Sequence, residues 1–219
     1  MFGLFRKKTN ASKEAILAEA DAEIAKLRDV YFANLPSGNP VAQAGLGEMY
    51  RDGIGVPQND DEAVRLYRLA ADQGYIDAQF ELGNLYFSGK CVSKNDAEAF
   101  KWFHMAAEQG HDVAQKNLGL MYANGLGISQ DNEEAAKWLR LASDQGNFIA
   151  QYNLGEMYEF GDGVPQSAEL ALMWFVVAKT NGNSKSSEKI NDISAGMTRD
   201  QIEASKAKAL MYLSNKKSI

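Results

Sequence analysis

Residues Ala114–Gly146 read AQKNLGLMYANGLGISQDNEEAAKWLRLASDQG, and this stretch resembles the sequence that lies 36 residues before it and 36 residues after it. A fixed period of this length is the signature of a stacked repeat array. The sequence therefore predicts a repeat scaffold. The period is marked by four columns of identical residues: Ala42, Ala78, Ala114 and Ala150; Leu46, Leu82, Leu118 and Leu154; Gly47, Gly83, Gly119 and Gly155; Tyr50, Tyr86, Tyr122 and Tyr158.

Each repeat is predicted to be a pair of antiparallel helices, which gives an all-α solenoid. The first helix, helix A, is expected near 40–52, 76–88, 112–124 and 148–160, and a glycine turn follows it because glycine adopts positive φ without steric cost. The second, helix B, should start after a side chain that caps it. These expected caps are Asn59, Asn95, Asp131 and Ser167, and Glu62, Glu98 and Glu134 stand three residues later, as in a capping box.

Gly47 and its equivalents fall in the middle of helix A, where glycine costs about 1 kcal/mol relative to alanine. Its recurrence predicts that helix B presses on the bare backbone at this point. Helix B should bury large side chains, each contributing roughly 1.5–3 kcal/mol. The expected set is Leu66, Trp102, Trp138 and Trp174, with Tyr67, Phe103, Leu139 and Phe175 beside them.

The unbroken period predicts one array rather than two domains. Residues 1–11 are interpreted as a flexible leader, and 12–37 as an N-terminal capping helix that starts at Ser12 and represents a degenerate half-repeat. Four repeats of 36 residues occupy 38–185, and C-terminal capping helices occupy 186–219. The ends diverge because a terminal repeat must present a polar face to water. In the last helix Thr198 and Gln201 form a capping box, and Ile202, Leu210 and Leu213 are expected to face inward.

The recurring pattern A-Q-x-x-L-G-x-M-Y, G-x-G-V and A-x-x-W-x-x-x-A-A-x-Q-G resembles the Sel-1-like repeat family, a relative of the tetratricopeptide repeat. The resemblance covers about 38–182. It implies an α/α superhelix whose concave face binds other proteins, and it implies no catalysis. Some secreted members carry a disulfide in each repeat and are linked to penicillin binding. Cys91 is the one cysteine here, so that activity is not carried over.

Composition limits the possible partners. The segment 42–185 holds 20 acids and 11 bases, a net charge of −9, whereas the whole chain has −6. This acidity argues against nucleic-acid binding, which requires lysine and arginine to displace phosphate counterions. No apolar run approaches the roughly 20 residues of a membrane span. With a single cysteine no internal disulfide is possible, which suits a reducing compartment, so a cytoplasmic location is expected.

No catalytic, cofactor-binding or metal-binding constellation is recognisable, and the protein is not expected to be an enzyme. His104, His111 and Cys91 lack the spacing of a zinc helix or of a nucleophile beside its base. The glycine turns follow helices and lack the lysine–serine/threonine pair of a phosphate loop. We therefore expect no cofactor and no metal.

The predicted binding surface is the inner face of the A helices, where residues vary from repeat to repeat between fixed neighbours. A protein segment that combines basic and apolar side chains is the expected partner, because acids and exposed apolar anchors share this face. The predicted partner-binding residues are Glu48, Asp52, Asp77, Glu81, Asn84, Asn117, Leu120, Asn124, Asn153, Glu156 and Phe160.

Two other functions stay open. The first uses the same binding physics in an immunity-type inhibitor that blocks a toxin or effector. The second belongs to another class, a hydrolase acting on cell-wall-like substrates, and would require a nucleophile–base pair in a cleft. The sequence offers no such pair.

Overall fold

The computed structural model describes residues 2–216, with the side chains of residue 13 and of 15–216. All regular structure in this part of the chain is helical. The helices cluster into two compact units, Met1–Lys94 and Asn95–Ile219. The division falls inside the second repeat, where the continuous 36-residue period marks no break. Among residues 2–216, no helix combines the length and the apolar character needed to cross a membrane.

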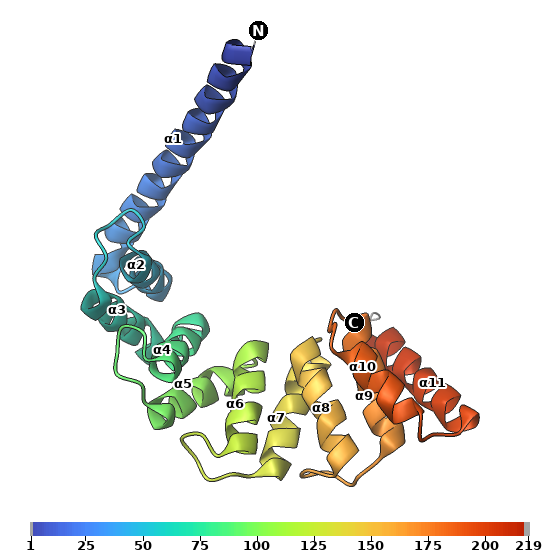
Figure 1. Ribbon diagram of the computed structural model, residues 1–219. Helices are drawn as coiled ribbons and strands as arrows, with labels where there is room; N and C mark the ends of the chain where they lie inside the picture. The colour runs from blue at the N-terminus through green and yellow to red at the C-terminus, as the bar shows by residue number, and fades with distance from the viewer. Residues whose placement is uncertain (1, 217–219) are drawn as a thin grey trace. The chain divides into compact units, whose positions relative to one another are not determined.

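The N-terminal unit begins with one uninterrupted helix (Figure 1). Residues 2–11, expected as a flexible leader, belong to this helix, so Ser12 lies within it instead of at its start. The extension has a local reason, since this stretch contains arginine, lysine and alanine, which favour helices, and no proline. The elements of the unit are α1 (Phe2–Asn34), the 3-10 turn η1 (Leu35–Ser37), α2 (Pro40–Asp52), α3 (Asp60–Asp72) and α4 (Ile76–Ser88).

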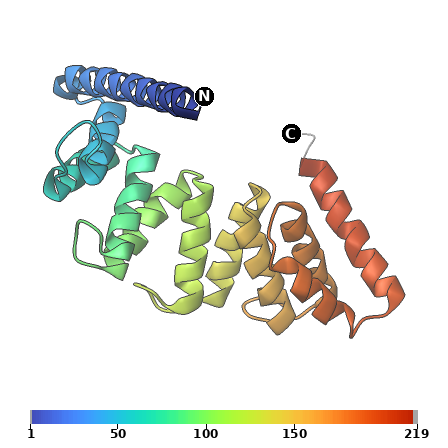
Figure 2. The same ribbon diagram turned by 45° about the horizontal axis from the view of Figure 1, so that its top comes forward.

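The C-terminal unit holds the remaining helices (Figures 1 and 2). Within it, α9 packs against α8, α10 and α11. These elements are α5 (Asp96–Glu108), α6 (Asp112–Asn124), α7 (Asn132–Asp144), α8 (Phe148–Phe160), α9 (Ala168–Thr180), α10 (Ser186–Ser194) and α11 (Arg199–Lys216).

The predicted caps of the B helices are confirmed. The side chain of Asn59 accepts a hydrogen bond from the amide of Glu62 at 3.1 Å, and Asp131 accepts from Glu134 at 3.0 Å. Each bond satisfies an amide that the helix itself leaves without an acceptor. The glycine turns are confirmed as well: Gly161, with φ of 79°, lies in the left-handed region and donates to the carbonyl of Met157 at 2.8 Å.

The second half of the predicted capping box is absent from the B helices. The carboxylate of Glu62 turns forward to Arg65, at 2.6 Å, instead of back to the cap. The reason is that the backbone amide of Asn59 already donates to the carbonyl of Tyr50, at 2.9 Å. In α11 the complete box forms, because the Thr198 amide donates to Oε1 of Gln201 at 2.9 Å and the Gln201 amide donates to Oγ1 of Thr198 at 3.3 Å.

The core of each unit is built from the predicted columns, with one correction. Phe103, Leu139 and Phe175 are buried, whereas Trp102 and Trp138 are only half-buried. Trp174 is 2% exposed, because Tyr212 of α11 covers it with ring centroids 5.1 Å apart. The burial of a helix-B tryptophan therefore depends on whether a side chain of a neighbouring helix covers it.

The mid-helix glycines meet helix B as predicted. A methyl group placed on Gly155 would lie 2.5 Å from the ring of Phe175, and one placed on Gly119 would lie 2.7 Å from Leu139. At Gly47 the corresponding gap is 3.3 Å, to Tyr67 and to the carbonyl of Ala63. Glycine thus allows the A and B helices of a pair to approach closely.

The Gly155→Ala variant should destabilise the protein by about 1–3 kcal/mol, the usual cost of overpacking a core, even though alanine is the better helix former. Phe175 is fully buried, so its ring could make room for a methyl group only by displacing its neighbours. Gly47→Ala, at the same position of the first repeat, should cost less because its neighbours are farther away. Urea unfolding of both variants checks this order, and equal stability of the two would contradict it.

A buried glutamine in helix A connects neighbouring repeats. Gln151 is fully buried, donates to the carbonyl of Ser143 at 3.1 Å and accepts from Asn181 at 2.9 Å. Gln115 is placed in the same way between Ala107 and Gln145. Since buried amides are costly when unpaired, these bonds fix the register of one helix pair on the next.

The last helix also departs from expectation at one position. Leu210, predicted to face inward, is 66% exposed, and Ala209 is buried in its place. Tyr212 and Leu213 pack against the core of the C-terminal unit from the same side as Ala209. The prediction was therefore wrong for Leu210 alone, because Leu213 packs against the core as expected and Ile202 is partly buried.

Candidate partner-binding surfaces

The predicted binding residues fall on two surfaces, one in each unit. All eleven lie on A helices. The N-terminal surface comprises Glu48 and Asp52 of α2 with Asp77, Glu81 and Asn84 of α4; the C-terminal surface comprises Asn117, Leu120 and Asn124 of α6 with Asn153, Glu156 and Phe160 of α8.

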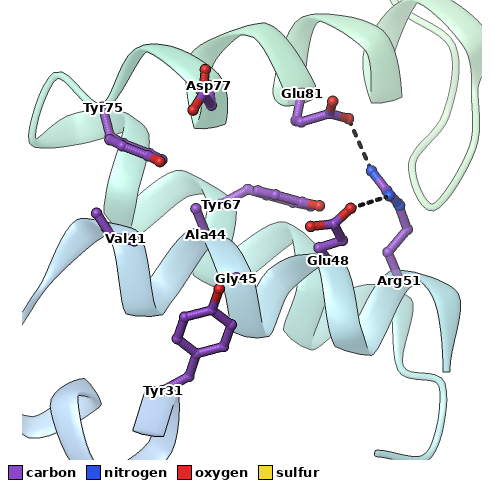
Figure 3. Close-up of a pocket in the computed structure, with 10 residues that line it drawn as sticks. All are labelled: Tyr31, Val41, Ala44, Gly45, Glu48, Arg51, Tyr67, Tyr75, Asp77 and Glu81. Carbon is purple, nitrogen blue, oxygen red and sulfur yellow. Dashed lines mark hydrogen bonds and ion pairs between the residues drawn. The ribbon is translucent and has the colours of Figure 1, made fainter. Parts of the chain in front are cut away.

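A pocket of about 190 Å³ opens on the N-terminal surface, and we name it the acidic pocket (Figure 3). It brings together three predicted residues, Glu48, Asp77 and Glu81. It also contains an arginine and three tyrosines that the sequence did not indicate. Its lining residues are Tyr31, Val41, Ala44, Gly45, Glu48, Arg51, Tyr67, Tyr75, Asp77 and Glu81.

Arg51, a residue of this surface, neutralises part of its negative charge. Its guanidinium contacts Asp52 at 2.7 Å, Glu81 at 2.9 Å and Glu48 at 3.5 Å. The hydrogen bond to Arg51 lowers the pKa of Asp52, which therefore stays ionised well below neutral pH. Lys90 also lies 3.4 Å from Asp52. The charge available to a basic partner is smaller than the row of acids suggests.

The other end of the acidic pocket is formed by Tyr75 and Asp77. Burial, and then a hydrogen bond to Asp77, raises the pKa of Tyr75. Glu81 has a raised pKa because it is buried, although Arg51 opposes this shift. Asn84 contributes a side-chain hydrogen bond to Glu81 and does not line the pocket.

A second pocket, of about 300 Å³, opens on the C-terminal surface, and we name it the asparagine pocket. It brings together four predicted residues, Leu120, Asn124, Asn153 and Glu156. Its other walls come from Ala123, Gln130, Asn132, Leu139, Met157 and Asp162. Asn124 and Asn153 each donate to a carbonyl one turn earlier in their own helix, at 2.7 Å, which holds both side chains along the helix surface.

Asn117 and Phe160 lie outside this pocket. Asn117 accepts a hydrogen bond from the ammonium of Lys116 at 2.5 Å, and burial lowers the pKa of Lys116. Phe160 is 62% exposed, with the ammonium of Lys189 5.2 Å from its ring centroid. An exposed aromatic ring of this kind is typical of an interface anchor.

Sequence reasoning missed the two bases that organise these surfaces, Arg51 and Lys189. Lys189 of α10 pairs with Glu159 of α8 at 2.8 Å, and Arg51 of α2 pairs with Glu81 of α4 at 2.9 Å. The two residues of each pair are 30 apart in the sequence. Glu159 and Lys189 stand three periods of 36 residues after Arg51 and Glu81, so the two pairs occupy equivalent positions with the charges exchanged. A search of the period for opposite charges at this separation could have found them.

The histidines and the cysteine make local contacts. The Nδ1 atom of His111 accepts from the amide of Ala114 at 3.1 Å and so caps α6. The ring of His104 lies 5.6 Å from that of Trp138. Burial, and then a hydrogen bond to Asp60, raises the pKa of Cys91 to about 11, so its thiol stays protonated and poorly nucleophilic at neutral pH.

These features define an all-α protein of stacked helix pairs, and comparison with known proteins identifies the family. The Sel1 repeat matches residues 40–75, 76–111, 112–147 and 149–183, which together make up more than half of the chain. The chain therefore belongs to the Sel1 repeat family, as its sequence resemblance predicted. Proteins of this family generally mediate protein–protein interactions on a scaffold that is generally non-catalytic.

Solved structures agree with this assignment. The c5321 protein, a protective antigen present in uropathogenic Escherichia coli strains and displaying an SLR fold, is 31% identical with a TM-score of 0.76; the match covers 85% of this chain and 41% of that one. This chain thus spans about two fifths of the length of that relative. A Sel1 repeat protein from Oxalobacter formigenes is 29% identical with a TM-score of 0.73, and the match covers 89% and 85% of the two chains.

A weaker match is the immunity protein Pa5087 from Pseudomonas aeruginosa, at 21% identity and a TM-score of 0.48, covering 86% of this chain and 74% of that one. This likeness carries no statement about function. The comparison with curated proteins found no match.

Proposed function

We propose that this protein is a non-catalytic adaptor that binds a segment of a partner protein on the exposed faces of its A helices. One observation carries the proposal: the hollows of the surface coincide with the positions that vary between repeats. The acidic pocket and the asparagine pocket together contain seven of the eleven predicted residues. A structural role alone would favour the same residues at these positions in every repeat, as it does in the constant helix-A columns that begin with Ala42, Leu46 and Gly47.

The chemistry of the two surfaces describes the partner. The N-terminal surface offers carboxylates, which would receive basic side chains and mainly steer association. The C-terminal surface offers Leu120 and Phe160 as apolar contacts, where interface energy tends to concentrate. Basic residues of a partner would therefore suit the N-terminal surface, and apolar residues of a partner would suit the C-terminal surface. The cytoplasmic location and the immunity-type variant of this function remain predictions.

The test is capture of partner proteins from a lysate of the native host, with wild-type and variant proteins as bait. Leu120→Ala and Phe160→Ala should each reduce recovery of a specific partner by tenfold or more, as loss of an anchor does. Leu141→Ala is the matched control, because Leu141 is a 47% exposed leucine on helix B. Loss of the partner in Leu141→Ala, with full recovery in the other two variants, would place the interface elsewhere.

A further inference from the structure

The acidic pocket contains a polar group that the fold leaves unused. The hydroxyl of Tyr67 is buried and has no hydrogen-bond partner, although the pocket around it is lined by charged side chains. The tyrosine as a whole is only 2% exposed. A buried hydroxyl normally finds a partner, because an unpaired one loses its hydrogen bonds to water without replacement. Figure 3 shows this hydroxyl pointing into the space between α2 and α4.

The charges around the hydroxyl favour a cation over an anion. Arg51 is held by Asp52 and Glu81, its two shortest ion pairs, so its own charge is already compensated. Glu48 lies farther from it, at 3.5 Å, with a side chain that is 66% exposed, and Asp77 is exposed on the opposite wall. Glu48 therefore pairs with Arg51 only at this longer distance. Asp77 has a hydrogen bond with the neutral Tyr75, so both carboxylates keep most of their negative charge for a ligand.

The walls suit the rest of a basic side chain. Tyr31, Tyr67 and Tyr75 surround the space with aromatic surface, and Val41 and Ala44 add aliphatic contacts. Aromatic faces attract cations, and a lysine or arginine side chain buries its methylene stem while its charged end meets polar groups. Burial raises the pKa of Tyr67, so its hydroxyl remains neutral and can accept a hydrogen bond from such a group.

We infer that the acidic pocket is a receptor for one basic side chain, lysine or arginine, of the partner segment, with Glu48 and Asp77 binding its charge and the Tyr67 hydroxyl accepting one of its N–H groups. The inference rests on the proposed adaptor function and specifies how the N-terminal surface selects its partner. The volume of about 190 Å³ suits a single side chain.

The inference can be tested without the partner, on the full chain, with n-butylammonium and n-butylguanidinium as probes of the isolated side chains. Titration followed by NMR should give saturable shifts at the amide of Gly45 and at the rings of Tyr67 and Tyr75. n-Butanol, which has the same stem without charge, should give none. Butyrate reports whether Arg51 instead makes the pocket an anion site.

Three variants sharpen the test. Tyr67→Phe should weaken binding of the cationic probes about tenfold, as loss of a hydrogen bond to a charged group does, while leaving the midpoint of urea unfolding unchanged or higher. A purely structural tyrosine would instead lose stability. Asp77→Asn should weaken binding comparably, and the exposed Asp72→Asn on α3 serves as the charge-matched control that leaves binding unchanged.

Equal shifts with n-butanol, saturable binding of butyrate, or binding that survives both Tyr67→Phe and Asp77→Asn would each overturn the inference. These outcomes are independent of the adaptor proposal, since a partner can still be captured through Leu120 and Phe160. Conversely, specific binding of the cations without any captured partner would support the pocket and count against the adaptor function.

Discussion

A chain that ends at Met197, and so lacks α11, should melt at a much lower temperature than the full chain. The helix covers the outer side of α9: Ala209 is fully buried, and the ring of Tyr212 lies against Trp174 at 5.1 Å. The Tyr212 hydroxyl also donates to the carbonyl of Ser143 at 3.0 Å. Exposing a large apolar side chain costs about 1.5–3 kcal/mol, and this truncation exposes several of them together.

Circular dichroism and calorimetry would measure this loss. A chain that ends at Lys216 is the control, because it retains all of α11 and should melt like the full chain. Should the chain that ends at Met197 melt at the same temperature as the control, α11 would not be a stabilising cap. The uncovered side of α9 should also promote self-association, which sedimentation would detect.

The second large effect is expected for Phe175→Ala, at about 3–5 kcal/mol of lost stability, as for other fully buried phenylalanines. Phe175 is completely buried, lies against Gly155, and its ring is 5.4 Å from that of Tyr152. Removing the ring leaves a cavity that the surrounding structure fills only in part. Urea unfolding followed by tryptophan fluorescence suits this measurement, because all three tryptophans belong to the same unit as Phe175.

Phe160→Ala provides the matched control for this substitution. Phe160 is the last residue of α8 and is 62% exposed, so the same change should alter stability by no more than about 0.5 kcal/mol. The two variants thus separate folding from binding, since Phe160→Ala is expected to impair partner capture while the protein stays folded. Comparable losses of stability in the two would contradict the assignment of core and surface.

Much of the fold could be predicted because the same sequence signals for helix starts, helix ends and turns recur in every repeat. The A helices begin and end where the period placed them, and Asn59 and Asp131 cap the following helices as expected. Features that depend on a contact made in one repeat only were harder to predict. Trp138 occupies the same column as Trp174, yet only Trp174 is covered by Tyr212, and the period carries no information about that contact.

The candidate site shows the same limit. The variable positions of helix A could be found by comparing repeats, and they do line the pockets. Their ion pairs could not be found in this way, because Arg51 of one repeat pairs with Glu81 of the next. The unpaired hydroxyl of Tyr67 lay beyond sequence reasoning altogether, since tyrosine in that column was assigned to the core.

The exchanged ion pairs have a consequence for how the array can change in length. Tandem repeats are gained and lost as whole units, and identical units could be joined in any order. If three repeats were lost so that α2 came to stand directly before α10, Arg51 would face Lys189, two like charges at a position that now holds opposite ones. A rearrangement that placed α8 directly before α4 would likewise bring Glu159 against Glu81. The order of the two charges therefore differs between the repeats at this position. Like charges would destabilise such a shortened chain, even where its buried core could still pack.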